Sequence, residues 1–208
     1  MDFFARYRPT RSPQLTSPAP HAVLGGDMLA PVEANNAQIF LAFGCFWGAE
    51  KLMWELGATM TAVGYQGGTV QFPSYQEVCT GTTGHAESVR VVYDPASLPL
   101  SRILQVFFES HDPTTLNRQG NDVGTQYRSA IFATTAEQVA LAREMMASYE
   151  KKLADAGLGP IVTELHEPPA PPFFYAEPYH QQYLYKNPGG YQCHARTGIA
   201  CPLPEGES

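Results

Sequence analysis

Hydrophobic residues change their spacing several times along the chain, and each change predicts the start or the end of an element. Residues 38–43 form a nearly continuous apolar run, which is typical of a strand covered on both faces. After Gly44, apolar residues recur at helical spacing, and Gly57 predicts the end of that helix. Thr135 and Gln138 form a capping-box signature for a later helix. Further strands are predicted at 59–65, 86–93, 128–133 and 161–165, with helical apolar faces at 100–108 and 139–153.

The order of these elements predicts the fold class. It is β-α-β-β-α-β followed by α-β, which is the pattern of a ferredoxin-like split βαβ core with an addition. We therefore expect an α/β fold, an α+β two-layer sandwich with helices on a mixed sheet. Prolines gather near both ends of the chain. They predict an irregular N-terminal leader at 1–36, an α/β domain at 37–185 and a mobile C-terminal tail at 186–208.

Composition narrows the class of protein. The 208 residues include 13 Lys and Arg against 20 Asp and Glu, a net charge of −7, and 44% are hydrophobic. This acidic balance argues against nucleic-acid binding, because a basic excess is needed to neutralise phosphates. The longest uncharged apolar stretch, residues 39–49, is too short to span a membrane. Charged residues and prolines interrupt the place where a signal-peptide core would lie, so we expect a cytoplasmic protein.

Cys45 lies at the junction between the first predicted strand and the first predicted helix. At the start of a helix, free backbone N–H groups and the positive end of the dipole favour a thiolate and lower the pKa of a thiol. The thiolate is the nucleophilic form of cysteine. Gly44 and Gly48 leave room for a reactant to approach. Position alone leaves a buried structural thiol open as the alternative.

Glu87 is the second unusual residue, because it interrupts an apolar strand face. Residues two positions apart share one face of a strand, so Glu87 lies in line with Val89, Val91 and Tyr93. A carboxyl group on an apolar face is desolvated, which raises its pKa and lets it act as a general acid near neutral pH. The alternative is that Glu87 lies at the wet end of the strand and meets solvent.

The other cysteines favour a redox interpretation. The chain has four cysteines and no C-x-x-C pair, which argues against a disulfide scaffold, a zinc ribbon and a thioredoxin-type motif. Cys193 and Cys201 lie eight positions apart in the tail and can meet if the tail is flexible. Two incidental surface thiols are the alternative.

Other constellations are weaker. Cys45 with His85 could suggest a Cys–His hydrolase, but the papain-type signature is absent. The remaining histidines lack metal-ligand spacing, so no metal site is predicted. The tyrosines around His180 are interpreted as a packed helical turn rather than as a cofactor site.

Six segments of the chain together resemble the A-type peptide methionine sulfoxide reductases. They are GCFWG (44–48), GYQGG (64–68), PSYQEVCTGTTGHAE (73–87), VVYDP (91–95), HDPTTLNRQGNDVGTQYRSAIF (111–132) and FFYAEPYHQQYLYKNPGGY (173–191). The resemblance covers about residues 38–201 and implies a ferredoxin-like core with a long coiled C-terminal segment. It also implies reduction of the S epimer of methionine sulfoxide, in proteins and as the free amino acid.

The resemblance implies a role for each matching residue. Cys45 matches the nucleophile that attacks the sulfoxide sulfur, and Glu87 matches the acid that protonates the sulfoxide oxygen. This fits the opposite pKa shifts expected for a thiol at a helix start and a buried carboxyl group. The remaining matches are Tyr75 and Tyr127 for the sulfoxide oxygen, Phe46 and Trp47 for the methyl group, and Asp122 for the substrate backbone.

The resemblance also implies a recycling route without a bound cofactor. Cys193 would attack the sulfenic acid on Cys45, Cys201 would then attack Cys193, and thioredoxin, or dithiothreitol in vitro, would supply the electrons. Two departures from the family pattern weaken the second exchange: Gln192 separates Tyr191 from Cys193, and Gly198 is the only glycine between the two tail cysteines. Cys79 matches a position without a catalytic role.

The expected partners are oxidised proteins and peptides, free methionine sulfoxide and thioredoxin, and the expected state is a monomer. Two rival functions stay open. A thiol peroxidase would use the Cys45 sulfenic acid without needing an aromatic methyl-binding pair. A non-catalytic module that binds methionine-rich peptides would need neither Glu87 nor the tail cysteines.

Overall fold

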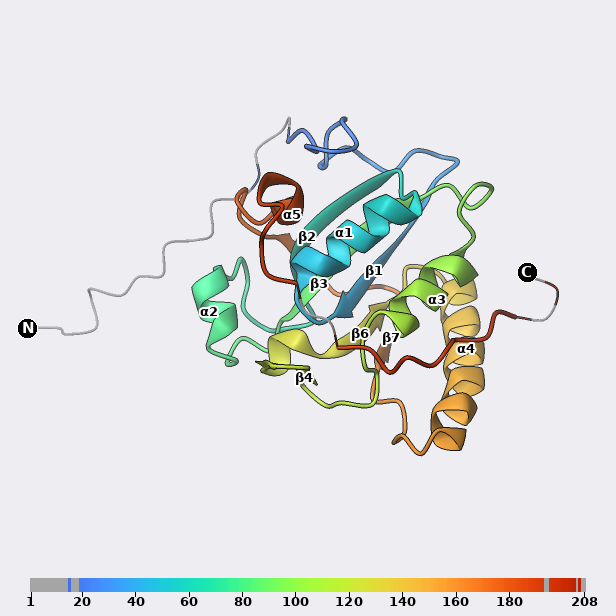
Figure 1. The fold of residues 1–208 in the computed structure, drawn as a ribbon. Coiled ribbons are helices and arrows are strands. Elements are labelled where there is room, and N and C mark those ends of the chain that lie inside the picture. Colours follow the sequence, from blue (N-terminus) through green and yellow to red (C-terminus); the bar gives the residue numbers. More distant parts are fainter. Residues whose placement is uncertain (1–14, 16–18, 193–194, 205, 207–208) are drawn as a thin grey trace, which may run out of the picture.

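The computed structural model describes residue 15, residues 19–192 and 195–204, and residue 206. Its main sheet has six strands in the order β7-β6-β1-β3-β2-β8 (Figure 1). These strands are β1 (Ala37–Phe43), β2 (Met60–Gln66), β3 (Ala86–Tyr93), β6 (Ser129–Phe132), β7 (Glu164–His166) and β8 (Phe173–Tyr175). Strands β4 (Arg118–Gln119) and β5 (Asp122–Val123) pair separately.

The topology confirms the predicted fold class. Strands β6, β1, β3 and β2 are adjacent in that order, and each neighbouring pair is antiparallel. This is the arrangement of a ferredoxin-like split βαβ core. Strand β7 joins β6 in parallel and β8 joins β2 antiparallel, so the sheet is mixed.

Three long helices and the sheet enclose the largest apolar core. They are α1 (Phe46–Leu56), α3 (Leu100–Glu109) and α4 (Ala136–Asp155), and the shorter helices are α2 (Tyr75–Cys79), a 3-10 turn (Thr125–Tyr127) and α5 (Tyr183–Lys186). Alternate strand residues, such as Leu41 and Val89, pack against helix residues such as Met53 and Phe107. Residues that point to the other sheet face, including Phe40 and Phe132, form a second cluster with Phe173.

Local signals fixed most element ends. Gly57 has φ +109° and ends α1 with backbone bonds to Met53 and Trp54, a conformation that glycine adopts without strain. Thr135 caps α4 through a bond from the Gln138 backbone N–H. The predicted capping box is only half formed, because the Gln138 side chain accepts from Thr134 rather than from Thr135.

The last predicted strand is displaced. It was expected at 161–165 and is observed at Glu164–His166. The reason is that the backbone N–H of Ile161 bonds to the Glu150 carboxylate and that of Val162 bonds to the Pro113 carbonyl. These donors are therefore used outside the sheet.

Both terminal segments pack on the domain where they are described. Residues 19–36 contain no helix, but His21 and Met28 are buried, and Pro20 pairs with Asp27. Residues 195–204 run past α3 and α4, where Tyr149 bonds to Thr197 (Figure 1). Among the described residues, no helix combines the length and the apolar character needed to cross a membrane.

Candidate active site

Cys45 occupies the N-cap position of α1, directly after β1. Gly44 makes the turn between strand and helix with φ +91°, a conformation that most other residues adopt only with strain. Cys45 is partly exposed. It lines a small cavity together with Gln192 and Ala195, two residues that flank the undescribed positions 193 and 194. The prediction of a thiol at a strand-to-helix junction is confirmed.

Glu87 lies next to this junction on β3 and is 2% exposed. Its neighbours on the same strand face, Val89 and Val91, belong to the main core, so the predicted apolar face is confirmed and the solvent-facing alternative is wrong. Oε2 of Glu87 accepts a hydrogen bond from the backbone N–H of Phe46 at 3.0 Å. Burial nevertheless raises the pKa of Glu87 to about 8, and the nearby Asp122 charge adds to the rise. Glu87 is therefore protonated at neutral pH.

Two tyrosines lie near enough to Glu87 for its charge to act on them. Tyr75 opens α2, and Tyr127 ends the 3-10 turn. Burial raises the pKa of both phenols, and the Glu87 charge raises them further. Cys45 and Asp122 also raise the pKa of Tyr127, which places that ring near both groups. Both hydroxyls thus stay protonated and can donate hydrogen bonds.

Phe46 and Trp47 form an aromatic wall beside Cys45. Phe46 is buried, and its ring lies 5.1 Å from the His180 ring. Trp47 stacks on Tyr183 with ring centroids 3.8 Å apart and an interplanar angle of 14°. The indole Nε1–H of Trp47 donates to Nδ1 of His180 at 3.0 Å.

The interpretation of the sequence missed His180 as a site residue. Its Nδ1 accepts from Trp47, and burial lowers its pKa to about 4, so the neutral ring carries its proton on Nε2. That Nε2 is buried and has no hydrogen-bond partner, although Oε2 of Glu177 lies 3.9 Å away. The Tyr75 ring lies 4.5 Å away. The predicted helical turn does form at Tyr183–Lys186, but its aromatic neighbours face Trp47.

Asp122 lies at the same site. Its Oδ1 accepts a hydrogen bond from the Tyr191 hydroxyl at 3.1 Å. Its Oδ2 is buried without a partner. In the part of the chain that the structure describes, three buried side-chain atoms lack a partner, namely Asp122 Oδ2, His180 Nε2 and Gln126 Oε1 beside Tyr127. Because buried polar groups normally have partners, the unpartnered atoms of Asp122 and His180 are candidates for binding a polar ligand.

Glu177 supports this arrangement from behind. Its Oε2 accepts from the Tyr65 hydroxyl at 2.8 Å, and its Oε1 accepts from the backbone N–H of Tyr75 at 2.9 Å. It therefore ties α2, which carries Tyr75, to the sheet.

Of the two predicted recycling cysteines, the structure describes Cys201. Cys193 lies outside the described residues. Cys201 is 1% exposed in the main core, and burial raises the pKa of its thiol to about 12. Its backbone N–H donates to Glu109 at 2.9 Å, and its carbonyl accepts from Gln105 at 3.0 Å. In this conformation the thiol of Cys201 is protonated and shielded from reactants.

Nothing in the described part of the chain is arranged to hold a metal ion through three or more His, Cys, Asp or Glu side chains.

Comparisons with known proteins identify the family of this chain. The sequence model of the family described as peptide methionine sulfoxide reductase matches residues 37–201. Peptide methionine sulfoxide reductase MsrA of Maricaulis maris is 53% identical over 196 residues, which cover 94% of this chain and 89% of that protein. The structure of methionine sulfoxide reductase A of Corynebacterium diphtheriae is 48% identical with a TM-score of 0.79, covering 92% of each chain.

Yeast Mxr1 is a more distant structural relative. Its reduced form from Saccharomyces cerevisiae is 36% identical with a TM-score of 0.72, covering 80% of this chain and 94% of that one. Mxr1 has also been solved in complex with Trx2; that chain is 21% identical with a TM-score of 0.50, covering 81% of this chain and 95% of that one, which shows the shared fold alone.

The family match spans most of the domain, and the relative from Maricaulis maris extends it over nearly the whole chain. The resemblance first seen in six sequence segments is thereby confirmed. The chain belongs to the A-type peptide methionine sulfoxide reductases, the enzymes that reduce methionine sulfoxide.

Proposed function

We propose that this enzyme reduces the S epimer of methionine sulfoxide, both protein-bound and free, through a sulfenic acid on Cys45. The observation that carries the proposal is the position of Glu87. A buried carboxyl group with a pKa of about 8 bonds to the residue that follows Cys45. The proton donor is thus hydrogen-bonded to the backbone of the residue that directly follows the nucleophile.

The two groups divide the chemistry between them. The helix start favours the thiolate of Cys45, which attacks the sulfoxide sulfur. Glu87 gives a proton to the sulfoxide oxygen, which is a poor leaving group until it is protonated. The oxygen passes to Cys45, whose sulfur is oxidised by two electrons to a sulfenic acid, while the substrate sulfur is reduced to a thioether. Solvent then returns the proton to Glu87.

The surrounding residues hold the substituents of the sulfoxide sulfur. Tyr75 and Tyr127 donate to the oxygen, and the wall of Phe46 and Trp47 contacts the methyl group through apolar and S–aromatic contacts. The unpartnered atoms of Asp122 and His180 suit the substrate backbone, Oδ2 accepting from an amide and Nε2–H donating to a carbonyl.

This arrangement implies selection of one epimer. The sulfoxide sulfur carries an oxygen, a methyl group and the side chain of the residue, and each is held by a different part of the site. Only one epimer can place its oxygen at Glu87 while its methyl group lies on Trp47. The assignment of that epimer as S follows from the family resemblance.

Epimer-resolved turnover tests the proposal. Incubating the enzyme with a peptide that contains racemic methionine sulfoxide, in the presence of dithiothreitol, should consume the S epimer alone, as separated by chromatography. Loss of both epimers, or of the R epimer, would contradict the proposed selection. Turnover of peroxide without turnover of either epimer would favour the thiol peroxidase.

Recycling requires the tail to move. The Cys193 thiolate attacks the sulfenic sulfur of Cys45, whose hydroxyl takes up a proton from solvent and leaves as water. The Cys201 thiolate then attacks Cys193 and frees Cys45 as a thiolate. Since Cys201 is buried and held by Glu109 and Gln105, the tail must detach before the second step. Thioredoxin supplies the electrons in our proposal, in keeping with the complex of Mxr1 with Trx2. The monomeric state and the cytoplasmic localisation stay predictions.

Replacing Cys201 by serine should separate the two stages. Cys201→Ser should keep the dithiothreitol-driven rate within about twofold, because Cys45 and Glu87 are unchanged, and should lower the thioredoxin-driven rate by about tenfold or more. Steady-state rates with both reductants measure this. Cys79→Ser is the matched control, since Cys79 is an exposed thiol outside the proposed exchange. An unchanged thioredoxin-driven rate in Cys201→Ser would show that Cys193 suffices.

A further inference from the structure

Helix α1 carries a buried carboxyl group, Glu50, that the proposed reaction does not use. Glu50 is 0% exposed and lies three positions after Trp47. Residues three apart on a helix lie on the same side, so Glu50 and Trp47 face the same neighbouring segment. That segment contains His180, Gln182 and Tyr183, as the contacts below show.

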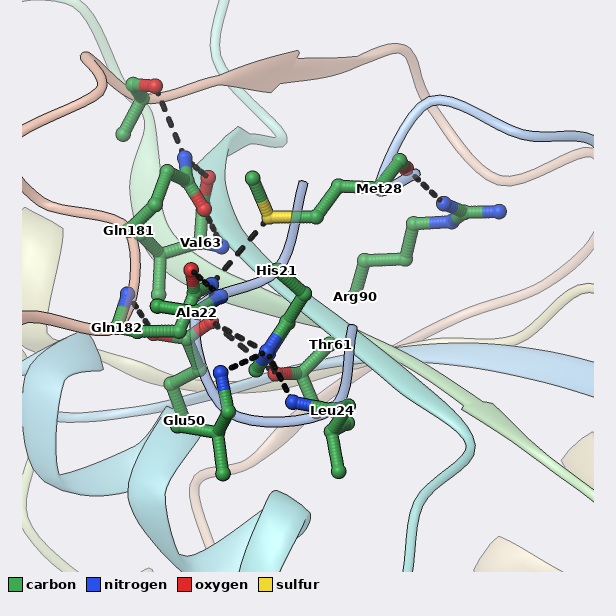
Figure 2. A network of polar contacts seen from close by, with 12 residues as sticks. His21, Ala22, Leu24, Met28, Glu50, Thr61, Val63, Arg90, Gln181 and Gln182 are labelled. Carbon is green, nitrogen blue, oxygen red and sulfur yellow. Dashed lines mark hydrogen bonds and ion pairs between the residues drawn. The ribbon is translucent and has the colours of Figure 1, made fainter. Parts of the chain in front are cut away.

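Three donors bind the Glu50 carboxylate (Figure 2). The backbone N–H of Gln182 donates to Oε2 at 2.8 Å, and the Gln182 side-chain amide donates to Oε1 at 2.7 Å. The Thr61 hydroxyl donates to Oε1 at 3.1 Å. Burial raises the pKa of Glu50 to about 7, and these hydrogen bonds oppose the rise. Above pH 7 the group is a carboxylate surrounded by donors.

His21, in the N-terminal segment, determines which way the Thr61 hydroxyl donates. Nδ1 of His21 accepts from the backbone N–H groups of Val23 and Leu24 at 3.1 and 3.0 Å. The proton of the neutral ring is therefore on Nε2, which donates to the Thr61 hydroxyl oxygen at 2.8 Å (Figure 2). Thr61 must then turn its own proton toward Glu50. In this chain of hydrogen bonds, the backbone N–H groups orient His21, His21 orients the Thr61 hydroxyl, and that hydroxyl donates to Glu50.

Gln182 is the residue that Glu50 holds, and its backbone is unusual. It has φ +48°, the left-handed region that residues other than glycine seldom adopt. Its two bonds to Glu50 compensate for that conformation. Gln182 directly precedes Tyr183, which stacks on Trp47, and follows His180 by two positions, which accepts from the Trp47 indole.

We infer that Glu50 is a positioning residue for the methyl-binding wall. It fixes the backbone at Gln182 and thereby holds His180 and Tyr183 against Trp47. The hydrogen bonds of Glu50 run to Gln182 and Thr61, so Glu50 acts on the wall through the 180–183 segment. The inference rests on the proposed role of Trp47 in binding the methyl group.

Glu50→Gln is the variant that tests this role. It keeps the shape of the side chain but replaces one acceptor oxygen by an NH₂ group that faces donors, so at least one bond is lost. The KM for the sulfoxide peptide should rise about tenfold, with kcat changed less than about threefold, because the reacting groups are untouched. Glu55→Gln is the matched control: it is the same change on α1 at an exposed carboxylate that pairs with Lys51, and its KM should not change.

The indole resonance of Trp47 gives a readout that does not depend on activity. The chain has two tryptophans, so its indole N–H region contains two signals, and Trp47→Phe assigns them. The Trp47 signal should shift in Glu50→Gln, because its bond to His180 is disturbed, and should not shift in Glu55→Gln. If Glu50→Gln fails to fold, Thr61→Val removes one donor from Glu50 and should shift the same signal in the folded protein.

The two readouts separate the possible failures. A Trp47 signal that does not move in Glu50→Gln overturns the positioning role, whatever happens to KM. A shifted signal with an unchanged KM also overturns the inference that Glu50 acts on substrate binding. If Trp47→Phe itself leaves KM unchanged, the proposed role of Trp47 is what fails, and the indole shift alone then decides whether Glu50 holds the segment.

Discussion

Cys45→Ser is expected to lower turnover of methionine sulfoxide by at least about 10⁴-fold, because a serine hydroxyl is not ionised at neutral pH and is a far weaker nucleophile. The substitution should not disturb the fold, because Cys45 is the N-cap of α1 and serine is a favoured N-cap residue. Chromatographic measurement of methionine formed with dithiothreitol gives the rate.

Two controls make the Cys45 result specific. Cys79→Ser should leave turnover within about twofold, since Cys79 is not assigned to the reaction and a serine hydroxyl can keep the hydrogen bond of Cys79 to the Tyr75 side chain. Thermal unfolding of Cys45→Ser should resemble that of the parent. Substantial turnover in Cys45→Ser would assign the nucleophile to another residue and remove the basis of the proposed mechanism.

Glu87→Gln should lower kcat by about 10²- to 10⁴-fold, the range for loss of a general acid. A glutamine keeps the size of the side chain and can still accept from the Phe46 N–H, but its amide is not acidic enough to transfer a proton to the sulfoxide. Glu144→Gln on α4 is the control, because this carboxyl group is exposed, and it should leave kcat unchanged. Equal kcat values for Glu87→Gln and the parent would contradict the acid role.

The pH profile distinguishes loss of an acid from general damage. The pKa of Glu87 is raised to about 8, so the parent keeps its acid below pH 8 and should lose kcat as the pH rises through 8. Glu87→Gln should lack that decline. Linkage gives the same sign for stability: the raised pKa makes Glu87 favour folding at acid pH, and this contribution is lost as the pH rises from the unfolded value of 4.5 to about 8.

Sequence reasoning located the central pair because both signals are local. The period-two pattern of β3 placed Glu87 on an apolar face, and the switch from a strand to a helical period placed Cys45 at the start of α1. The antiparallel register between β1 and β3, in which Leu41 pairs with Val89, then brings the two groups together. The sequence pattern could suggest that pairing through the fold class but not its register.

The wall partner of Trp47 could not be predicted in this way. His180 is 133 positions from Trp47, and the segment between Pro178 and Tyr183 has no period that marks a buried face. The docking of His21 beside Glu50 was not predicted either, because the 19–36 segment has no periodic pattern and contains no helix. Such contacts depend on tertiary packing, which overrides local propensity.

The burial of Cys201 in the C-terminal tail (186–208) could not be predicted from the sequence either. The prolines and glycines of the tail indicated irregular structure, and the residues described there are irregular. The same pattern gave no sign that Cys201 is buried beside Glu109, because Ile199 and Leu203 are isolated apolar residues that pack on α3 and α4 only once the domain has formed. Whether an isolated apolar residue is buried depends on the surface that residues far away in the sequence form in the folded domain.

A single-turnover reaction tests the central claim most directly. Reduced enzyme with Cys193→Ser and Cys201→Ser is mixed with the S-sulfoxide peptide without any reductant, and the protein is analysed by mass spectrometry with a sulfenic-acid trapping reagent. We expect one methionine per enzyme and one trapped sulfenic acid, located on Cys45. Methionine formed with Cys45 still a thiol, or a sulfenic acid found on another cysteine, would contradict it.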